Sequence, residues 1–344
     1  MAVRQLGLAL LVQCTLFSLS GSSAEPTLSR FEFESKHMGT TIRIVLYAAD
    51  KPTAEKAAAA AFARVAQLDR VLSDYNPNSE VMQLCKRNDV EPGKPIAVSA
   101  ELFDILAKAE SVSKVCEGSF DVTVGPLVKL WRLARKTQVL PDAKELTDAM
   151  GKTGFEKVIL VTNGKTVTLK VPGMRLDFGG IGKGYAADEA LNVLRDQFHI
   201  SRALVAAYGD ITCGDAPPDT DGWTVDIAPI SKDQAPRRLK LVNRAVSTSG
   251  DMEQYTVIDG VRYSHVLNPK TGLGLTGRRS VTVIAKHGWQ ADAYAKVASV
   301  LPTDKALPMI DALDEGAMYI VMKETDDANE QVKASKRFDR YLVK

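Results

Sequence analysis

Two pairs of strand-like segments, each joined by a short glycine turn, constrain the fold of this chain most. Residues 157–169 and 254–267 each read as two short strands around an Asn-Gly or Asp-Gly dipeptide, at residues 163–164 and 259–260. Such dipeptides adopt the positive φ angles of a tight hairpin, and a hairpin pairs its strands antiparallel. Helical segments interrupt the strands without the regular alternation of a parallel sheet. The sequence therefore predicts an α+β fold with antiparallel sheets.

Helices are predicted beside these hairpins. Residues 53–72 are rich in alanine and carry apolar side chains at helical spacing, which indicates a long helix. Ser99 can cap a second helix over residues 100–116, and Gly118 can end it. Further helices are predicted over residues 185–198, 289–301 and 305–313, and further strands over residues 40–47, 203–206, 223–228, 239–242, 281–285 and 317–322.

Composition favours one mixed domain. The 344 residues are 45% hydrophobic and 25% charged, which is ordinary for a globular protein, and they contain neither an internal repeat nor a linker-like stretch. Although this length would permit two domains, we expect a single domain over residues 25–344, in which helices flank antiparallel sheets. The 44 basic and 42 acidic side chains leave a net charge of +2 without a basic cluster, which argues against a nucleic-acid partner.

Residues 1–24 have the layout of a secretory signal peptide. Arg4 supplies a positive start, residues 6–19 are mostly apolar, and residues 22–24 offer small side chains for cleavage. A buried helix or a membrane anchor is the alternative, but the apolar stretch is shorter than the roughly 20 residues that span a bilayer. We therefore expect export to the periplasm, with a lipid anchor on Cys14 as a lesser alternative. The sequence after residue 24 predicts no segment that crosses a membrane.

Three cysteines follow this segment, Cys85, Cys116 and Cys213. An odd number cannot pair completely within one chain, and their spacing matches no zinc site. We expect small buried side chains and no disulfide framework.

Residues 177–185 (DFGGIGKGY) place four glycines and a lysine between a predicted strand and a predicted helix. Glycines let the backbone approach a ligand closely, and the exposed N–H groups of a helix N-terminus attract phosphate. Lys183 adds a positive charge. The order of residues matches neither the Walker loop nor the Rossmann fingerprint. On its own, this segment predicts either a phosphate-binding loop or a tight structural turn.

Two later motifs each carry one candidate functional side chain. Residues 263–272 (YSHVLNPKTG) run from a strand into a polar turn, where His265 can act as a general base on a hydroxyl. A half-buried strand histidine with ordinary hydrogen bonds is the alternative. Asp292 lies among small residues near the start of a helix, where a carboxylate can hold a metal or cap the helix.

Two other stretches are ambiguous by themselves. Residues 116–127 (CEGSFDVTVGPL) predict a turn and a short strand punctuated by glycine and proline. Tyr75 follows the first helix in a polar break, where it can stack on a planar ring or lie on the surface.

Taken in order, these motifs resemble those of the ApbE family over roughly residues 31–313. The likeness rests on residues 37–41 (HMGTT), 72–80 (LSDYNPNSE), 118–127 (GSFDVTVGPL), 177–185 (DFGGIGKGY), 246–251 (VSTSGD) and 263–272 (YSHVLNPKTG). The resemblance implies an exported FAD:protein FMN transferase of α+β fold. Such an enzyme binds FAD and uses Mg²⁺ to cleave its pyrophosphate. It attaches FMN by a phosphoester to a Thr or Ser of an exported or membrane partner protein, and AMP leaves.

The resemblance also assigns roles to residues of this chain. Tyr75 would stack on the isoalloxazine ring, and His265 would lie by the pyrophosphate and activate the acceptor hydroxyl. The other FAD contacts would come from Met38, Ser119, Phe120, Asp121, Asp177 and Lys183. The Gly180 carbonyl and Asp292 would ligate Mg²⁺. Phosphoryl transfer builds negative charge, which backbone N–H groups, a lysine and a divalent ion can stabilise.

The chain departs from the family pattern at three places. The family has a threonine four residues after the aspartate of the last motif, and this chain has Lys296 there. One helical turn puts Lys296 on the same face as Asp292, where its ammonium would pair with the carboxylate and weaken Mg²⁺ binding. Asn268 stands where the family usually has aspartate, and residues 206–210 (AAYGD) contain fewer glycines. Two alternatives to transfer therefore stay open, a non-catalytic FAD-binding member and an FAD pyrophosphate hydrolase.

Overall fold

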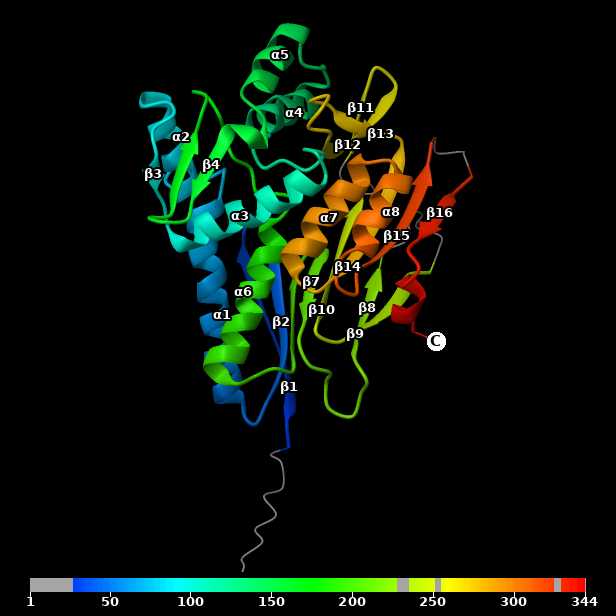
Figure 1. Ribbon diagram of the computed structural model, residues 1–344. Helices are drawn as coiled ribbons and strands as arrows, with labels where there is room; N and C mark the ends of the chain where they lie inside the picture. Colours follow the sequence, from blue (N-terminus) through cyan, green and yellow to red (C-terminus); the bar gives the residue numbers. More distant parts are fainter. Residues whose placement is uncertain (1–26, 228–234, 251–254, 325–328, 344) are drawn as a thin grey trace, which may run out of the picture.

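An eight-stranded antiparallel sheet forms the centre of the computed structural model, which describes residues 27–227, 235–250, 255–324 and 329–343 (Figure 1). The predicted signal peptide and Cys14 lie outside these residues. Every neighbouring pair of strands in the sheet is antiparallel. In spatial order the strands are β1 (Ser29–His37), β2 (Thr40–Ala48), β6 (Ala203–Ala207), β7 (Asp210–Cys213), β10 (Arg244–Gly250), β14 (Arg278–Ala285), β15 (Ala317–Lys323) and β16 (Gln331–Ala334).

A layer of helices packs on this sheet. α1 contacts β1 and β2, α6 contacts β6 and β7, α7 contacts β10 and β14, and α8 contacts β15. Figure 1 shows α1 and α6 side by side, with α7 and α8 following along the sheet. The bounds of these helices are α1 Lys51–Leu72, α6 Gly182–Phe198, α7 Gly288–Val300 and α8 Thr303–Asp311.

Alanines explain how α1 packs so closely on α6. Asp50 caps the helix by accepting the Thr53 N–H, so α1 begins at Lys51, two residues before the predicted start. Ala54, Ala57 and Ala61 are fully buried on one face. Side chains this small leave room for α6 to pack against that face.

A second, smaller layer covers the opposite face of the sheet. The hairpin of β8 (Trp223–Ile227) and β9 (Arg237–Leu241) contributes alternate side chains to an apolar cluster with sheet residues such as Leu204 and Val246. The short helix η2 (Phe338–Tyr341) adds Phe338, whose ring stacks on Tyr319. The sheet is therefore covered on both faces, which explains why many of its residues are buried.

Two smaller units lie above the helix layer in Figure 1. One combines α2 (Glu80–Val90), α3 (Ala100–Val115) and η1 (Phe155–Lys157) with a sheet of β3 (Ile96–Ala97), β5 (Thr166–Leu169) and β4 (Val158–Val161). The other packs α4 (Gly125–Thr137) and α5 (Ala143–Gly151) against a sheet of β11 (Tyr255–Ile258), β12 (Val261–Leu267) and β13 (Gly274–Thr276).

The predicted α+β class with antiparallel sheets and flanking helices is confirmed. Both predicted glycine hairpins are present, as β4–β5 and β11–β12. The prediction of a short strand within residues 116–127 is wrong: Val124 forms a single bridge with Arg175, and a helix begins at Gly125. Pro126 causes this, because proline suits the first turn of a helix and lacks the N–H that a strand would use.

The remaining cysteines are buried and unpaired, as predicted for Cys85, Cys116 and Cys213. Among the described residues, no helix combines the length and apolar character needed to cross a membrane.

Candidate functional site

The glycine loop forms the start of α6. Residues 176–178 belong to no strand, which corrects the predicted strand before the loop. The Asp177 N–H donates to the Val122 carbonyl. The helix begins at Gly182, three residues earlier than predicted. A Cβ on Gly184 would lie 2.1 Å from the carbonyl oxygen of Gly288, so only glycine allows α6 and α7 to approach at this point.

The N-termini of α6 and α7 cap each other through two buried carboxylates. Asp188 of α6 accepts the backbone N–H groups of Gly288 (2.7 Å) and Trp289 (3.1 Å) at the start of α7. Asp292 of α7 accepts the N–H of Gly184 (3.2 Å) in the first turn of α6. Asp292 therefore caps a different helix from the one that contains it. Two helix N-termini, each a region of positive potential, consequently lie together.

Four charged side chains meet beside this crossing. Lys183 Nζ lies 2.7 Å from Asp210 Oδ2, and Lys296 Nζ lies 3.1 Å from Asp292 Oδ1. Both carboxylates are buried, with 4% of Asp210 and none of Asp292 exposed. Ser247 Oγ donates to the other oxygen of Asp210 at 2.5 Å. We call Lys183, Asp210, Asp292 and Lys296 the charge quartet.

The pKa shifts within the charge quartet indicate that its two ion pairs interact. Burial would raise the pKa of Asp210, but the ammonium groups of Lys183 and Lys296 hold that pKa below its ordinary value. Burial opposes the charge of Lys183, yet Asp210 and Asp292 together raise the pKa of this lysine. Each of these groups therefore responds to charge from both pairs, and the lysine at the glycine loop stays protonated at neutral pH.

Tyr75 and Asp177 are joined by an arginine that the sequence analysis did not single out. Arg132 on α4 donates Nη1 to Asp74 Oδ2 at 2.6 Å and Nη2 to Asp177 Oδ2 at 3.1 Å. Its guanidinium carbon lies 4.3 Å from the centre of the Tyr75 ring. With 76% of Tyr75 exposed, its ring can also contact a ligand. Burial, followed by the charge of Asp74, raises the pKa of Asp177.

The remaining predicted FAD contacts differ in how close they lie to the glycine loop. A Cβ on Gly182 would lie 3.7 Å from Met38 Cε, and one on Gly180 would lie 3.2 Å from Phe120 Cε2, so both side chains reach the loop. Ser119 is buried, and its backbone N–H donates to the Cys116 carbonyl at 3.0 Å.

Both carboxylate oxygens of Asp121 accept hydrogen bonds from neighbouring parts of the chain. One oxygen accepts the N–H and the hydroxyl of Thr123, both at 2.7 Å, and the other accepts the Phe155 N–H at 2.8 Å. Burial raises the pKa of this carboxyl in spite of those bonds. A contact between Asp121 and FAD would therefore be made by its backbone.

His265 lies at a bulge in β12. Tyr263 and Leu267 are four positions apart, whereas their partners on β13, Thr276 and Gly274, are two positions apart. Ser264 stabilises the bulge: its Oγ accepts the Val266 N–H at 3.1 Å. Such bulges commonly reorient a side chain beside a functional site.

The bulge is fixed from two sides. The indole Nε1 of Trp131 donates to the Ser264 carbonyl at 3.2 Å, which ties β12 to α4. β12 also contacts α7, the helix that carries Asp292 and Lys296. In the following turn, Asn268 Oδ1 accepts the Lys270 N–H at 2.9 Å, a role that does not need the negative charge of aspartate.

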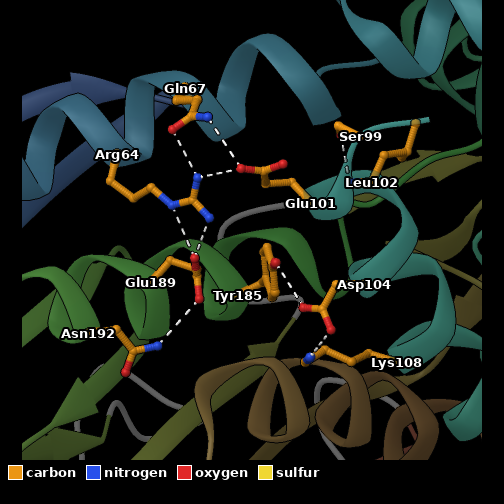
Figure 2. Close-up of polar contacts among 10 residues, drawn as sticks. All are labelled: Arg64, Gln67, Ser99, Glu101, Leu102, Asp104, Lys108, Tyr185, Glu189 and Asn192. Atoms are coloured by element: carbon orange, nitrogen blue, oxygen red, sulfur yellow. Dashed lines mark hydrogen bonds and ion pairs between the residues drawn. The ribbon is translucent and has the colours of Figure 1, made fainter. Parts of the chain in front are cut away.

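A polar network anchors the first turns of α6 to α1 and α3 (Figure 2). Arg64 of α1 contacts Glu189 of α6 at 2.5 Å and Glu101 of α3 at 2.8 Å. The Tyr185 hydroxyl, just after the glycine loop, donates to Asp104 of α3 at 2.9 Å. These bonds fix the direction in which α6 leaves the loop.

Sequence reasoning missed Arg132, Asp188 and Asp210, because no local pattern marks them. Each side chain acts on a segment far away along the chain, such as Asp188 on Gly288. Asp210 lies in the stretch noted for its few glycines, and its pairing with Lys183 gives it a role.

Two helix N-termini, a glycine loop and two lysines lie together in this antiparallel α+β protein, and these are features that suit a phosphorylated ligand. The ApbE family model matches residues 38–321. An FAD:protein FMN transferase of Klebsiella pneumoniae (strain 342) is 32% identical over 327 residues, which cover 92% of each protein. The FAD:protein FMN transferase of Escherichia coli (strain K12) is 34% identical over 283 residues, covering 80% of this chain and 78% of that protein.

The fold is also that of solved members. The flavin transferase ApbE from Vibrio cholerae superposes with a TM-score of 0.80 at 27% sequence identity, covering 92% of this chain and all of that one. The chain belongs to the ApbE family.

Proposed function

We propose that this protein is an FAD:protein FMN transferase. It binds FAD, cleaves the pyrophosphate, attaches FMN to a Thr or Ser of an exported or membrane partner protein, and releases AMP. The observation that carries the proposal is that the glycine loop with Lys183 and the strand with His265 both lie against α7. Relatives named FAD:protein FMN transferase support it, with 92% and 78% of their length aligned to this chain.

In the proposed transfer step, His265 acts as the general base for the acceptor hydroxyl. The acceptor hydroxyl oxygen attacks the phosphorus of the FMN half, and the bond from that phosphorus to the bridging oxygen breaks. AMP leaves with the bridging oxygen, and the hydroxyl proton passes to His265. The bulge at Ser264 holds this side chain in place for the transfer.

FAD binding uses the side chains and backbone around the loop. The exposed Tyr75 ring, with Arg132 on one face, stacks on the isoalloxazine. Met38, Ser119, Phe120 and Asp177 line the rest of the site, and Asp121 contributes backbone. Lys183 contacts the pyrophosphate beside the N-terminus of α6, whose positive potential favours phosphate.

Magnesium is the second cofactor that the family resemblance implies, with the Gly180 carbonyl and Asp292 as its ligands. The residues present do not fit that ion. Both oxygens of Asp292 are engaged, one by Lys296 Nζ and the other by the Gly184 N–H, and a lysine offers no oxygen ligand. Among the described residues, no group of three His, Cys, Asp or Glu side chains could hold a metal. The proposal therefore contains no step through a metal.

We also propose that the protein is exported to the periplasm. The composition of residues 1–24 supports this, and Cys14 offers a lipid anchor as the lesser alternative. Mass spectrometry of the protein from the membrane and periplasmic fractions distinguishes a chain that begins after residue 24 from one that retains these residues.

The transfer assay combines the protein with FAD and an acceptor protein that carries a flavinylation Thr or Ser. Covalent flavin is measured by in-gel fluorescence and AMP by chromatography, and we expect both in equal amounts. His265→Ala should lower the transfer rate about 100-fold or more without weakening FAD binding. His199→Asn is the matched control, because His199 is exposed at the end of α6 with φ 56°, a conformation that asparagine tolerates.

The two alternatives give different results in the same assay. Tight FAD binding with neither product would contradict the transferase proposal and favour a non-catalytic FAD-binding member. AMP without a labelled acceptor would favour a hydrolase that uses water in place of the protein hydroxyl.

A further inference from the structure

We propose that the ammonium group of Lys296 is the resident cation of this site, so that the protein binds FAD and transfers FMN without a divalent metal ion. The part that concerns transfer rests on the proposed function. The part that concerns FAD binding does not depend on transfer.

Lys296 contacts both residues that would ligate Mg²⁺, Gly180 and Asp292. Its Nζ lies 3.1 Å from Asp292 Oδ1, and its Cγ would lie 3.2 Å from a Cβ on Gly180. The stem of the lysine therefore packs against the loop residue whose carbonyl would be one ligand, while its head occupies the carboxylate that would be the other. Only 18% of the Lys296 side chain is exposed. A hydrated Mg²⁺, which keeps several of its waters, needs the space that this side chain fills.

The second oxygen of Asp292 is also unavailable to a metal without loss. It accepts the Gly184 N–H at the crossing of α6 and α7, where the two backbones are in contact. Turning the carboxylate toward a metal would break this bond and leave a buried N–H without its partner. A buried donor left without an acceptor destabilises the folded state, because it has given up its hydrogen bond to water.

Charge balance favours the lysine over a metal in this chain. The charge quartet contains two ammonium and two carboxylate groups, so its formal charge is zero when all four are ionised. A divalent cation added to this group would raise its net charge to +2, because the two carboxylates are already balanced by Lys183 and Lys296. The charge quartet is therefore neutral without a metal ion.

The lysines have a direct function toward FAD. Lys183 in the loop and Lys296, whose stem packs on Gly180, carry ammonium N–H donors near the start of α6, where the pyrophosphate of FAD would lie. An ammonium carries half the charge of Mg²⁺ but donates hydrogen bonds itself. We therefore expect lysine donors to contact the pyrophosphate directly.

FAD affinity with and without metal is the first test. Flavin fluorescence quenching is titrated in excess EDTA and in millimolar MgCl₂. We expect the two dissociation constants to agree within about twofold for the wild type. Lys296→Thr, which places a hydroxyl one helical turn from Asp292, should bind FAD about tenfold more tightly with Mg²⁺ than with EDTA. Lys305→Thr on the exposed surface of α8 should behave as the wild type does.

Metal binding to the FAD-free protein is the second test and requires no activity. Mn²⁺ titrations followed by electron paramagnetic resonance should show no stoichiometric site in the wild type and one site in Lys296→Thr. A stoichiometric Mn²⁺ site in the wild type that Asp292→Asn removes would overturn the proposal. So would a loss of wild-type FAD affinity of about tenfold or more in EDTA.

Lys296→Met keeps the stem of the side chain on Gly180 and removes only the charge, so it tests the ammonium even if the threonine variant folds poorly. We expect its FAD affinity to fall about tenfold or more without rescue by Mg²⁺. Wild-type affinity in this variant would refute the proposal. Transfer that requires Mg²⁺ would reject the inference but keep the transferase, whereas metal-independent FAD binding without transfer would reject the transferase alone.

Discussion

Asp188→Asn should destabilise the protein by an amount that depends on pH. Asp188 is nearly buried, and its two oxygens accept three hydrogen bonds, from Gly288 N, Trp289 N and Thr212 Oγ1. Burial raises the pKa of this carboxyl to about 6 from an ordinary value of 3.8, although those bonds oppose the shift. The folded protein therefore holds a proton on Asp188 over a pH range in which the unfolded chain has lost it.

The sign of the effect follows from this difference. For an acid with a raised pKa in the folded state, the contribution to stability is complete below the unfolded pKa and disappears as the pH rises through the folded pKa. A shift from 3.8 to about 6 makes this contribution about 2 kcal/mol at pH 4.5 and close to zero at pH 7.5. Asparagine does not titrate, so the variant lacks this dependence.

The asparagine variant also loses a hydrogen bond at every pH. Its amide NH₂ replaces one carboxylate oxygen, so it faces an N–H donor at the start of α7. An unsatisfied buried donor costs about 1–3 kcal/mol. The penalty for Asp188→Asn should therefore be about 2 kcal/mol larger at pH 4.5 than at pH 7.5.

Urea unfolding of both proteins at the two pH values measures the difference, because other titrating groups are common to both and cancel. A penalty that is equal at pH 4.5 and pH 7.5, or larger at pH 7.5, would refute the reasoning. Asp196→Asn is the matched control, because Asp196 is exposed near the end of α6.

Three further substitutions test separate parts of the structure. Gly184→Ala should lower the free energy of unfolding by about 3 kcal/mol or more, or prevent soluble expression, because the new methyl would lie 2.1 Å from the Gly288 carbonyl oxygen; an unchanged melting temperature would contradict this packing. Lys165→Gly should raise the free energy of unfolding by about 1 kcal/mol, since the exposed Lys165 has a φ of 45° in the turn between β4 and β5; thermal unfolding measures this, and a loss of stability would count against backbone strain there. Trp131→Phe removes the indole bond to the Ser264 carbonyl, so it should lower the rate of FMN transfer about tenfold while the FAD dissociation constant stays within about twofold; a weakened FAD affinity with a normal rate would show that the bulge serves binding instead.

Local chemistry was sufficient to predict much of the fold. Asn-Gly and Asp-Gly predicted the β4–β5 and β11–β12 hairpins, because these dipeptides favour the positive φ angles of tight turns. Ser99 predicted the start of α3 and accepts the Leu102 N–H as an N-cap should. The helix at Gly125 was missed, since a glycine and proline that often mark turns here begin a helix instead.

The site was predictable only where one segment supplies the relevant contact. Lys296 lies one turn after Asp292 on the same helix, so the sequence predicts their ion pair by periodicity, and the structure has it at 3.1 Å. The pairing of Lys183 with Asp210 joins a helix to a strand 27 residues away, and no spacing rule connects them.

Turn preferences, caps and helical periodicity act within a few residues, so they were enough to predict the α+β class, the Asn-Gly and Asp-Gly hairpins, most helices, the likeness to the ApbE family and the Lys296 departure. Contacts between segments far apart along the chain needed the folded structure: Asp188 and Asp292 cap each other's helices, Arg132 joins Tyr75 to Asp177, and Lys296 packs on Gly180. Those contacts depend on how closely α6 and α7 cross. Gly184 and Gly288 permit that approach because neither carries a Cβ, and packing of both helices on the same sheet brings the two glycines together.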